Sequence, residues 1–378
     1  MNRKMYECFR KLPLLVIGLT SITSFGFAFD SEAESLSNQH HNNQETPIKI
    51  SGSISFDGSL LTSQMASENL TQDLYLRKLK LGFEKEFIEN WMVELTLDLE
   101  EDADVKLDDY AISYGAINDL DIAVGVVDIE LGLQNSTSSK VSSTLEKDLG
   151  TNALIPKGKF GLALQWHQKH YSAFFNMFES NRDFNTGNNT YGLSAKLNYV
   201  FSKDYHFGVN VALVDYGSQL FEINAKPELN LADDLIQSDA FRARSLRFFA
   251  LEYAQRYNQL NLQSEVMWLF VTADQEFNPV NPNSSHSSAY LQASYFVKGD
   301  ANKFKKGNYA KRSDTQHALE LVTRLSGLYL QNESITESMV NVLIGVNYYV
   351  NDDIKLMGNM VIVKDYGPGF AARAQIAF

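Results

Sequence analysis

Few side chains in this sequence are arranged for catalysis or metal binding. His167 and His170 have the spacing of a metal-ligand pair, but they straddle an expected tight turn at 168–169 and have no third ligand nearby. His40 and His41 are adjacent in a polar segment, a pattern that rarely binds a metal. No Gly-rich phosphate loop precedes a helix, and no particular Ser/His pair suggests a hydrolase. The sequence therefore predicts no catalytic site, metal or cofactor.

Charged side chains recur instead on the polar faces of segments that alternate between apolar and polar residues. Clustered bases attract anions, and a lumen of mixed sign selects by the charge of its narrowest section. The acids on these faces are Glu94, Asp98, Asp109, Glu252, Glu265 and Glu320, and a further base is Lys355. The predicted pore-lining or anion-attracting residues are Lys78, Lys80, Lys196, Lys298, Lys303, Lys305, Lys306, Lys311, Arg312, Arg324 and Arg373.

Six of these bases lie between Lys298 and Arg312, where Asp300 is the one acid, so the segment carries a net charge of +5. Two interpretations remain open. The segment could be a solvated basic hairpin, or it could fold into a pore mouth and attract anions. Elsewhere, the acids of 91–101 follow the lysines of 73–87 closely enough to pair with them across neighbouring strands.

The elements that must position these charges are strands. Residues 48–60 alternate strictly, with Ile48, Ile50, Ile54, Phe56 and Leu60 on one face and polar residues on the other. Residues 170–178 are apolar on both faces. Further strands are expected at 73–87, 91–101, 105–114, 121–129, 159–167, 170–178, 190–200, 205–216, 243–255, 259–271, 287–298, 316–328, 338–350, 353–364 and 369–378. This gives sixteen strands, and bacterial single-chain barrels have an even number.

The last strand indicates how the sheet closes. Phe370, Ala372, Ala374, Ile376 and Phe378 share one face, and the apolar pattern continues to the final residue. A strand that closes a membrane barrel needs such a face. We therefore expect an all-β transmembrane antiparallel barrel of about sixteen strands, in which 369–378 pairs with 48–60.

The connections between these strands fall into two classes. One set is short, except at 299–315, and the other includes the long segments 61–72, 130–158, 179–189, 217–242 and 272–286. Short periplasmic turns and long extracellular loops are typical of such barrels. Segment 130–158 is the best candidate for a loop that folds inward and narrows the lumen, whereas 217–242 is acidic.

The amino-terminal segment indicates export. Residues 1–28 have a basic start, an apolar run and small residues before position 28, as in a cleaved secretory signal peptide. Residues 29–47 form a polar, flexible leader, and 48–378 form the barrel. The single cysteine, Cys8, lies in the signal, so the mature chain has no disulfide. Removing four bases and one acid changes the net charge from −13 to −16, which argues against nucleic acid as a partner.

The later part of the chain resembles the phosphate-selective porin O and P family of outer-membrane channels. Upstream, 76–79 (LRKL) resembles the family's paired-base strand, and Val124-Gly125 resembles the strand before its constriction loop. The other segments that carry the resemblance, in family order, are 191–212, Pro227-Glu228, 249–265, 290–300, 320–324, 347–357 and 373–375. The resemblance covers most of 48–378, but it is patchy before residue 190.

This resemblance implies a homotrimer of sixteen-stranded channels in the outer membrane of a Gram-negative cell, passing small anions such as phosphate or other small solutes. It also favours inward folding of 299–315. The sequence departs from the family in one respect: members selective for phosphate line the lumen densely with Arg and Lys, whereas several positions here are acidic. The alternative is a non-conducting outer-membrane interaction protein, such as an adhesin or scaffold, whose lumen is plugged.

Overall fold

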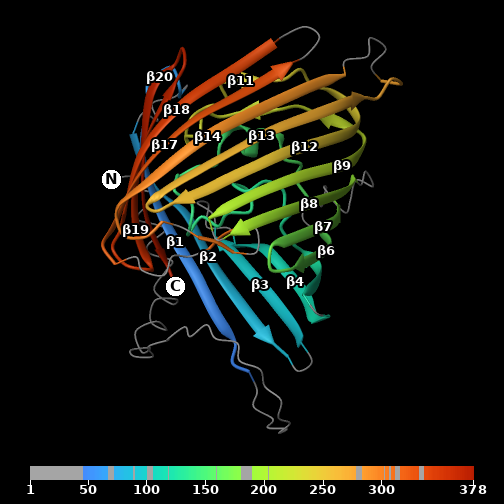
Figure 1. Cartoon of the computed structure of the whole chain (residues 1–378). Coiled ribbons are helices and arrows are strands. Elements are labelled where there is room, and N and C mark those ends of the chain that lie inside the picture. Colours follow the sequence, from blue (N-terminus) through green and yellow to red (C-terminus); the bar gives the residue numbers. More distant parts are fainter. Residues whose placement is uncertain are drawn as a thin grey trace.

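The alternation that begins at residue 48 continues around a closed barrel of sixteen antiparallel strands in the computed structural model (Figure 1). Each expected strand overlaps one strand of the barrel, so the predicted fold class is confirmed. In order, the barrel strands are β1 (Lys49–Leu60), β2 (Gln72–Glu86), β3 (Trp91–Leu99), β4 (Val105–Ile117), β5 (Leu120–Val126), β6 (Phe160–His167), β7 (Tyr171–Glu179), β8 (Tyr191–Ser202), β9 (Tyr205–Phe221), β12 (Phe241–Tyr257), β13 (Leu260–Ala273), β14 (Ser284–Lys298), β17 (Ala318–Gln331), β18 (Thr336–Tyr349), β19 (Ile354–Val363) and β20 (Gly367–Ala377).

The structure describes residues 46–66, 72–87, 90–99, 105–117, 119–158, 160–179, 190–202, 204–277, 283–301, 303–305, 308–310, 316–331 and 336–378. The expected signal peptide and most of the leader lie outside these ranges. Apart from the barrel, the chain forms helix α2 (Leu149–Leu154) and two small hairpins, β10 (Asn224–Ala225) with β11 (Ile236–Gln237), and β15 (Lys303–Lys305) with β16 (Asn308–Ala310). None of the helices in the described ranges has the length and apolar character to cross a membrane.

The barrel closes between its first and last strands, as the terminal pattern predicts. Strand β20 pairs antiparallel with β1, with Ile54 opposite Ile376 and Asp57 opposite Arg373. Beyond the strand, Gly52 N–H donates to the Phe378 carbonyl at 2.8 Å, and Phe378 N–H donates to the Gly52 carbonyl at 3.0 Å. These bonds continue the seam to Gly52 and Phe378.

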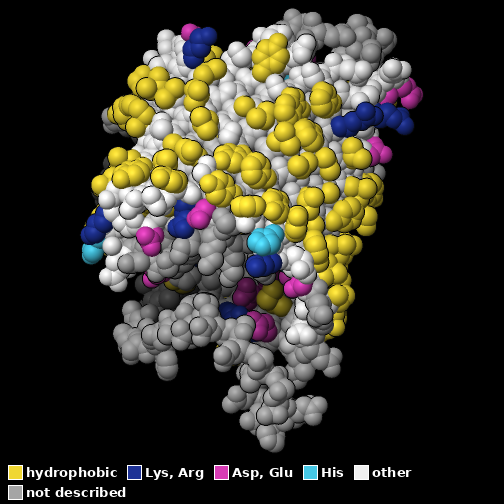
Figure 2. Space-filling view, viewed as in Figure 1, with side chains coloured by type: hydrophobic (Ala, Val, Ile, Leu, Met, Phe, Trp, Pro, Cys, Tyr) yellow, Lys and Arg dark blue, Asp and Glu magenta, His cyan; other side chains and the backbone are white. Residues whose placement is uncertain are grey.

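The two faces of each strand differ in exposure because successive side chains point to opposite sides of the sheet. On β18, Val340, Val342, Ile344 and Val346 point outward and are exposed. Inward residues of the same strand, such as Asn341, are fully buried. Figure 2 shows the outcome on the face in view, a broad apolar band with charged side chains mostly above and below it. Such a band is the surface that lipid covers.

We call the end where β1 begins and β20 finishes the terminal end, and the opposite end the loop end. The terminal-end connections are short at 87–90, 118–119, 168–170, 203–204, 258–259 and 350–353 and long at 299–317. Asp119 and Asn258, with φ of 61° and 52°, take the left-handed conformation that two-residue hairpin turns require. The loop end carries the long connections 61–71, 127–159, 180–190 and 222–240.

Aromatic side chains collect on the outer surface near the terminal end. The rings of Trp91 and Tyr114 lie 4.8 Å apart, and those of Tyr171 and Tyr199 lie 4.9 Å apart. Phe201 extends this group and is 64% exposed. Aromatic girdles of this kind mark the membrane–water boundary of outer-membrane barrels. The girdle therefore places one edge of the lipid band near the terminal end.

Candidate functional site: a lumen divided by an internal loop

The connection between β5 and β6 leaves the wall and crosses the inside of the barrel. Its backbone is held by inward side chains of distant strands. Gly132 N–H donates to Asn210 Oδ1 of β9 at 2.9 Å. Leu133 and Gln134 N–H donate to the two carboxylate oxygens of Glu265, on β13, at 2.9 and 2.8 Å. The inward folding expected of 130–158 is therefore what the structure shows.

Three of the predicted anion-attracting bases hold this loop in place. Lys196 Nζ donates to the Gly132 carbonyl at 3.2 Å. Arg324 donates to the Glu146 carbonyl at 3.0 Å, and Arg373 donates to the Leu145 carbonyl at 2.9 Å. The three side chains face inward, as expected, but their residues are only 1%, 1% and 8% exposed.

Each of these enclosed bases is also paired with an acid. Lys196 lies 3.2 Å from Glu252 on β12, and Arg324 lies 2.9 Å from Glu228 in the 222–240 connection. Arg373 contacts Asp57 at 2.7 Å and Glu146 at 3.1 Å. A charge that is removed from water needs such a partner. These bases therefore form structural pairs and present little free charge to a passing ion.

An acid and an amide hold the middle of the loop. The carboxylate of Glu320, on β17, accepts hydrogen bonds from Ser143 Oγ at 2.6 Å, Asn347 Nδ2 at 2.8 Å and Tyr349 OH at 2.7 Å. Asn347 Nδ2 also donates to the Ser143 carbonyl at 2.8 Å. Lys355 Nζ donates to the neighbouring Ser142 carbonyl. The loop is thus bonded to β17, β18 and β19.

Helix α2 begins inside the barrel at a buried cap. The Asp148 carboxylate accepts from Gly150 N–H at 2.8 Å and Thr151 N–H at 3.2 Å, as an N-cap does. Leu149 N–H donates to Glu228 Oε1 at 3.2 Å, which joins the helix start to the 222–240 connection. Burial raises the pKa of both the Asp148 and Glu228 carboxyls. The two inward-folded segments therefore meet at a pair of buried acids.

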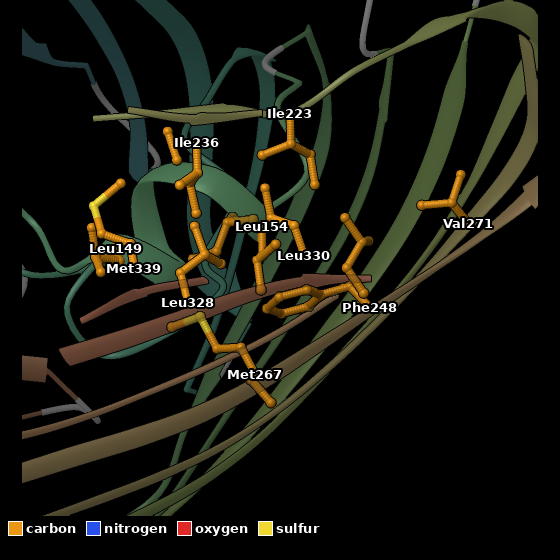
Figure 3. Close-up of a cluster of buried hydrophobic side chains, with 14 of the residues drawn as sticks. Leu149, Leu154, Ile223, Ile236, Phe248, Met267, Val271, Leu328, Leu330 and Met339 are labelled. Atoms are coloured by element: carbon orange, nitrogen blue, oxygen red, sulfur yellow. The ribbon is translucent and has the colours of Figure 1, made fainter. Parts of the chain in front are cut away.

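An apolar core fills the adjoining part of the lumen (Figure 3). Leu149 and Leu154 of α2 pack with Ile223 and Ile236, which flank or lie in the β10–β11 hairpin. The barrel wall contributes inward apolar side chains from β12, β13 and β17, namely Phe248, Met267, Leu328 and Leu330. Apolar residues on both faces of a strand fit this arrangement, because one face meets lipid and the other meets the core. Apolar side chains therefore close this part of the lumen.

Water-accessible space remains along the opposite wall, formed by β1 to β6. A cavity of about 690 Å³ reaches the terminal end and is bounded by residues of β2 to β6, including Glu86, Thr96 and Gln165. A second cavity of about 570 Å³ lies toward the loop end, between β1–β3 and the internal loop, and is bounded by Tyr75 and Gln134. The lumen is therefore divided into a packed side, filled by the internal loop, its clamps and the apolar core, and a side with open space, which we call the hydrated half.

The two cavities differ in charge. The charged residues of the loop-end cavity are the bases Arg77, Lys78, Lys147 and Arg373 and the acids Asp98 and Glu146. Those of the terminal-end cavity are Glu86, Glu94, Asp109, Asp121, Asp128 and Glu130, with no base among the described residues that bound it. Near the rim of the terminal-end cavity, Lys49 Nζ lies 2.5 Å from Glu86 Oε1. A solute that crosses the hydrated half meets a mixed section and an acidic section.

Two predicted bases on β2 belong to this hydrated half. Lys78 borders the loop-end cavity. Lys80 lies opposite Asp98 in the β2–β3 register and 3.8 Å from its carboxylate. The cross-strand pairing expected between 73–87 and 91–101 is therefore confirmed for this pair.

The basic segment near the terminal end is described only in part. Lys298 is exposed at the last position of β14. Lys303 and Lys305 lie on the backbone of β15, while Lys306, Lys311 and Arg312 lie outside the described residues. Phe296, Ala301, Ala318 and Tyr349 form a small buried cluster at the base of the segment. The choice between a solvated hairpin and a pore-mouth element stays a prediction.

The two spaced histidines hydrogen-bond to protein groups. His167 Nδ1 lies 3.2 Å from Ser172 Oγ, and His170 Nδ1 lies 3.0 Å from the Val200 carbonyl. Within the described ranges, no group of three or more His, Cys, Asp or Glu side chains is placed to hold a metal ion.

Sequence reasoning did not identify two bases that border the hydrated half, Arg77 and Lys147, nor several of its acids. Arg77 faces the lumen beside Lys78 because a bulge interrupts the β1–β2 register between Ser55 and Phe56. Its guanidinium lies 3.7 Å from Glu146. Lys147 reaches the cavity from the loop, donates to Asn135 Oδ1 at 2.7 Å, and has a pKa lowered by burial. The adjacent Arg77 and Lys78 in 76–79 could have indicated Arg77. Lys147 lies in a connection between strands, where no alternating pattern indicates its direction.

Comparison with known proteins agrees with this architecture. The family model for phosphate-selective porin O and P matches residues 48–367. OmpT, an outer membrane protein of Vibrio cholerae, superposes with a TM-score of 0.60 at 8% identity, over 88% of this chain and 97% of that one. An anion-selective porin from Comamonas acidovorans superposes with a TM-score of 0.58 at 10% identity, over 88% and 99%. No curated protein sequence matches.

The two superpositions fall below the identity at which function can be transferred, so they support the barrel fold alone. The family match shows more than the fold, because it spans most of the chain. It includes the strands that carry the internal loop and the side chains that hold it. Family and fold are those of a channel rather than an enzyme. The chain belongs to the phosphate-selective porin O and P family and is an outer-membrane porin.

Proposed function

We propose that this porin is a passive diffusion channel for small hydrophilic solutes, and that its path runs along the β1–β6 wall. The observation that carries the proposal is the division of the lumen. The internal loop and the apolar core occupy one side, whereas two cavities of about 690 and 570 Å³ with charged linings adjoin the other side. Small ions need a hydrated, polar path of this kind.

We further propose a modest preference for anions such as phosphate, located in the loop-end cavity. Arg77, Lys78 and Lys147 border that cavity beside Asp98 and Glu146, and Arg373 is committed to ion pairs. The basic segment that begins at Lys298 would add to this preference if it folds into the pore mouth. The acidic terminal-end cavity acts in the opposite direction, so the preference is small.

Planar-bilayer recordings test both parts. The purified protein should give stable single-channel currents, and its reversal potential under a KCl gradient should shift toward the chloride equilibrium potential. A shift toward potassium would overturn the anion preference and leave the channel intact. Charge reversal of Lys303, Lys305 and Lys306 should move the potential toward potassium; an unchanged value would support the solvated hairpin.

The alternative is a non-conducting interaction protein of the outer membrane, such as an adhesin or scaffold. The observation that favours it is the extent to which the loop and the apolar core fill the lumen. A folded, membrane-inserted barrel that gives no current would support this alternative and overturn the diffusion channel.

We also propose a homotrimer with the terminal end in the periplasm, exported by a signal peptide cleaved after Ala28. One structural neighbour is described as a trimer form of OmpT. Native mass spectrometry of the detergent-solubilised protein should give three chains per particle, each beginning at Phe29. A monomeric mass or a retained amino-terminal segment would contradict the corresponding part.

A further inference from the structure

The two cavities approach each other along strands β2 and β3 of the barrel wall. On β3, Asp98 borders the loop-end cavity, and Thr96, the next inward residue, borders the terminal-end cavity. Inward residues two apart on a strand are separated by about 7 Å. On β2, Lys78 borders the loop-end cavity, and Lys80 is the next inward residue toward the terminal end. Lys80 and Asp98 therefore lie at the level where one cavity gives way to the other, and we call this level the junction.

A three-residue ion cluster occupies this junction. Lys80 Nζ lies 3.8 Å from Asp98 Oδ2 and also contacts Asp108 Oδ2. The side chains of Lys80, Asp98 and Asp108 are 24%, 18% and 19% exposed. By contrast, the side chains of the loop clamp formed by Arg324 and Glu228 are 0% exposed. The junction cluster is thus reached by water, and the clamp is not.

A strand irregularity brings the second acid into the cluster. Between Thr96 and Leu97 the β3–β4 register shifts, so that Asp109 lies opposite Thr96 and Leu107 lies opposite Leu97. Asp108 is the extra residue of this bulge, and its carboxylate faces Lys80 beside the normally placed Asp109. The bulge therefore raises the acidic charge at this level, which regular pairing would limit to one residue from β4.

We infer that the Lys80–Asp98–Asp108 cluster sets the ion selectivity of the pore. This inference rests on the proposed diffusion path along the β1–β6 wall. Lys80 balances the two carboxylates in part, so these three residues sum to −1. Lys78, the neighbouring inward base on β2, and Lys106, opposite Asp98 in the β3–β4 register, add positive charge beside them. The cluster stands between a cavity with bases and a cavity bounded by acids. A change of one charge there acts on every permeating ion, because charge at a junction determines which ions pass between the sections.

Opposite substitutions should move selectivity in opposite directions. Lys80→Gln leaves a cluster charge of −2 and should shift the reversal potential toward potassium. Asp98→Asn with Asp108→Asn leaves +1 and should shift it toward chloride. The controls are Lys364→Gln and Asp365→Asn, which remove one positive and one negative charge, respectively, from an exposed turn at the loop end and should leave the reversal potential at the wild-type value.

A charge-exchange variant keeps the test decisive if a single change impairs folding. Lys80→Asp with Asp98→Lys restores the cross-strand pair and the net −1, so it should insert and show wild-type selectivity. Wild-type reversal potentials in the conducting Lys80→Gln and Asp98→Asn/Asp108→Asn proteins, or altered selectivity in the exchange variant, would overturn the inference. Absence of current from the wild-type protein would instead overturn the proposed function.

Discussion

At the scale of single residues, exposure divides the inward charges into two groups. Lys196, Arg324 and Arg373 are enclosed and bind the internal loop, while Lys78 and Lys80 border or adjoin the hydrated half. Sequence periodicity places all five on the inner face but carries no information about what covers them. The group to which a base belongs depends on where a distant loop folds.

Removing an enclosed base should destabilise the protein. Arg324→Met leaves Glu228 buried without its cation, and breaking a buried pair in this way costs about 3–5 kcal/mol. Urea unfolding in detergent would measure the loss, and limited proteolysis would report release of the loop. Arg324→Met combined with Glu228→Gln removes both charges and should recover part of the stability. Equal losses in the single and double variants would contradict the pairing.

The buried cap of α2 predicts a pH dependence. Burial raises the pKa of the Asp148 carboxyl, so the folded chain holds this proton more tightly than the unfolded chain. The contribution of Asp148 to the free energy of unfolding is greatest below the ordinary carboxyl pKa of about 4 and falls as pH rises through the folded-state value. Asp148→Asn keeps an oxygen acceptor and does not titrate, so it should become more favourable relative to wild type as pH increases.

The urea midpoints of wild type and Asp148→Asn, measured across the pH range, would check this. Asp274 provides a control of opposite sign, because its hydrogen bond from Ser218 lowers the pKa of its carboxyl. The stability that Asp274 contributes is present above its ordinary pKa and is lost as pH falls through the lowered value. Asp274→Asn should therefore become less favourable relative to wild type as pH rises. A pH-independent difference for Asp148→Asn would refute the assignment.

At the scale of elements, the long strands could be predicted because each one lies between two different environments. Lipid outside and polar or packed interior inside impose a period of two over ten or more residues, as on β9 and β18. The short elements could not be predicted. Helix α2 has six residues, and β10 and β11 have two each, so none shows a repeating pattern.

The bulges in the β1–β2 and β3–β4 pairings could not be predicted from the sequence either, and they change which side chains reach the site. A bulge adds one residue to a strand and reverses which face the following side chains take. Regular alternation through 73–87 therefore assigned Lys78 and Lys80 correctly but could not place Arg77 beside Lys78. Likewise, Asp109 was expected in the lumen, whereas Asp108 faces Lys80 only because of the register shift in β3–β4. Part of the site thus depends on local departures from the pattern that identified the fold.

The apolar core should control how firmly the inward-folded elements are held. Leu154 is 1% exposed and packs among wall and loop residues, so Leu154→Ala should lower the free energy of unfolding by about 2–5 kcal/mol. The looser helix should also raise the single-channel current and its noise. Leu356→Ala is the matched control, since Leu356 is 45% exposed on the outer surface of β19. Equal effects of the two substitutions on current would argue that the core does not restrict the lumen.

At the scale of the whole molecule, the channel is eccentric. The family fold supplies a complete ring of strands, but the proposed solute path uses only the β1–β6 part of its circumference. The rest of the ring encloses a core that resembles the interior of a soluble domain. We therefore expect substitutions of the β2–β4 charges to change selectivity and substitutions of the β8–β20 clamps to change stability, on different sides of one barrel.

The clamps also have a mechanical consequence. From one loop, bonds run outward to five strands of the β9–β20 side of the ring, at Asn210, Glu265, Glu320, Asn347 and Arg373. Because these bonds link the loop to several strands, they should resist flattening of the barrel cross-section. We expect the conductance to stay constant when bilayer tension is raised by suction on a patched liposome, and to become tension-sensitive in Arg324→Met. A wild-type conductance that changes with tension would show that the bonds to the internal loop do not stiffen the barrel wall.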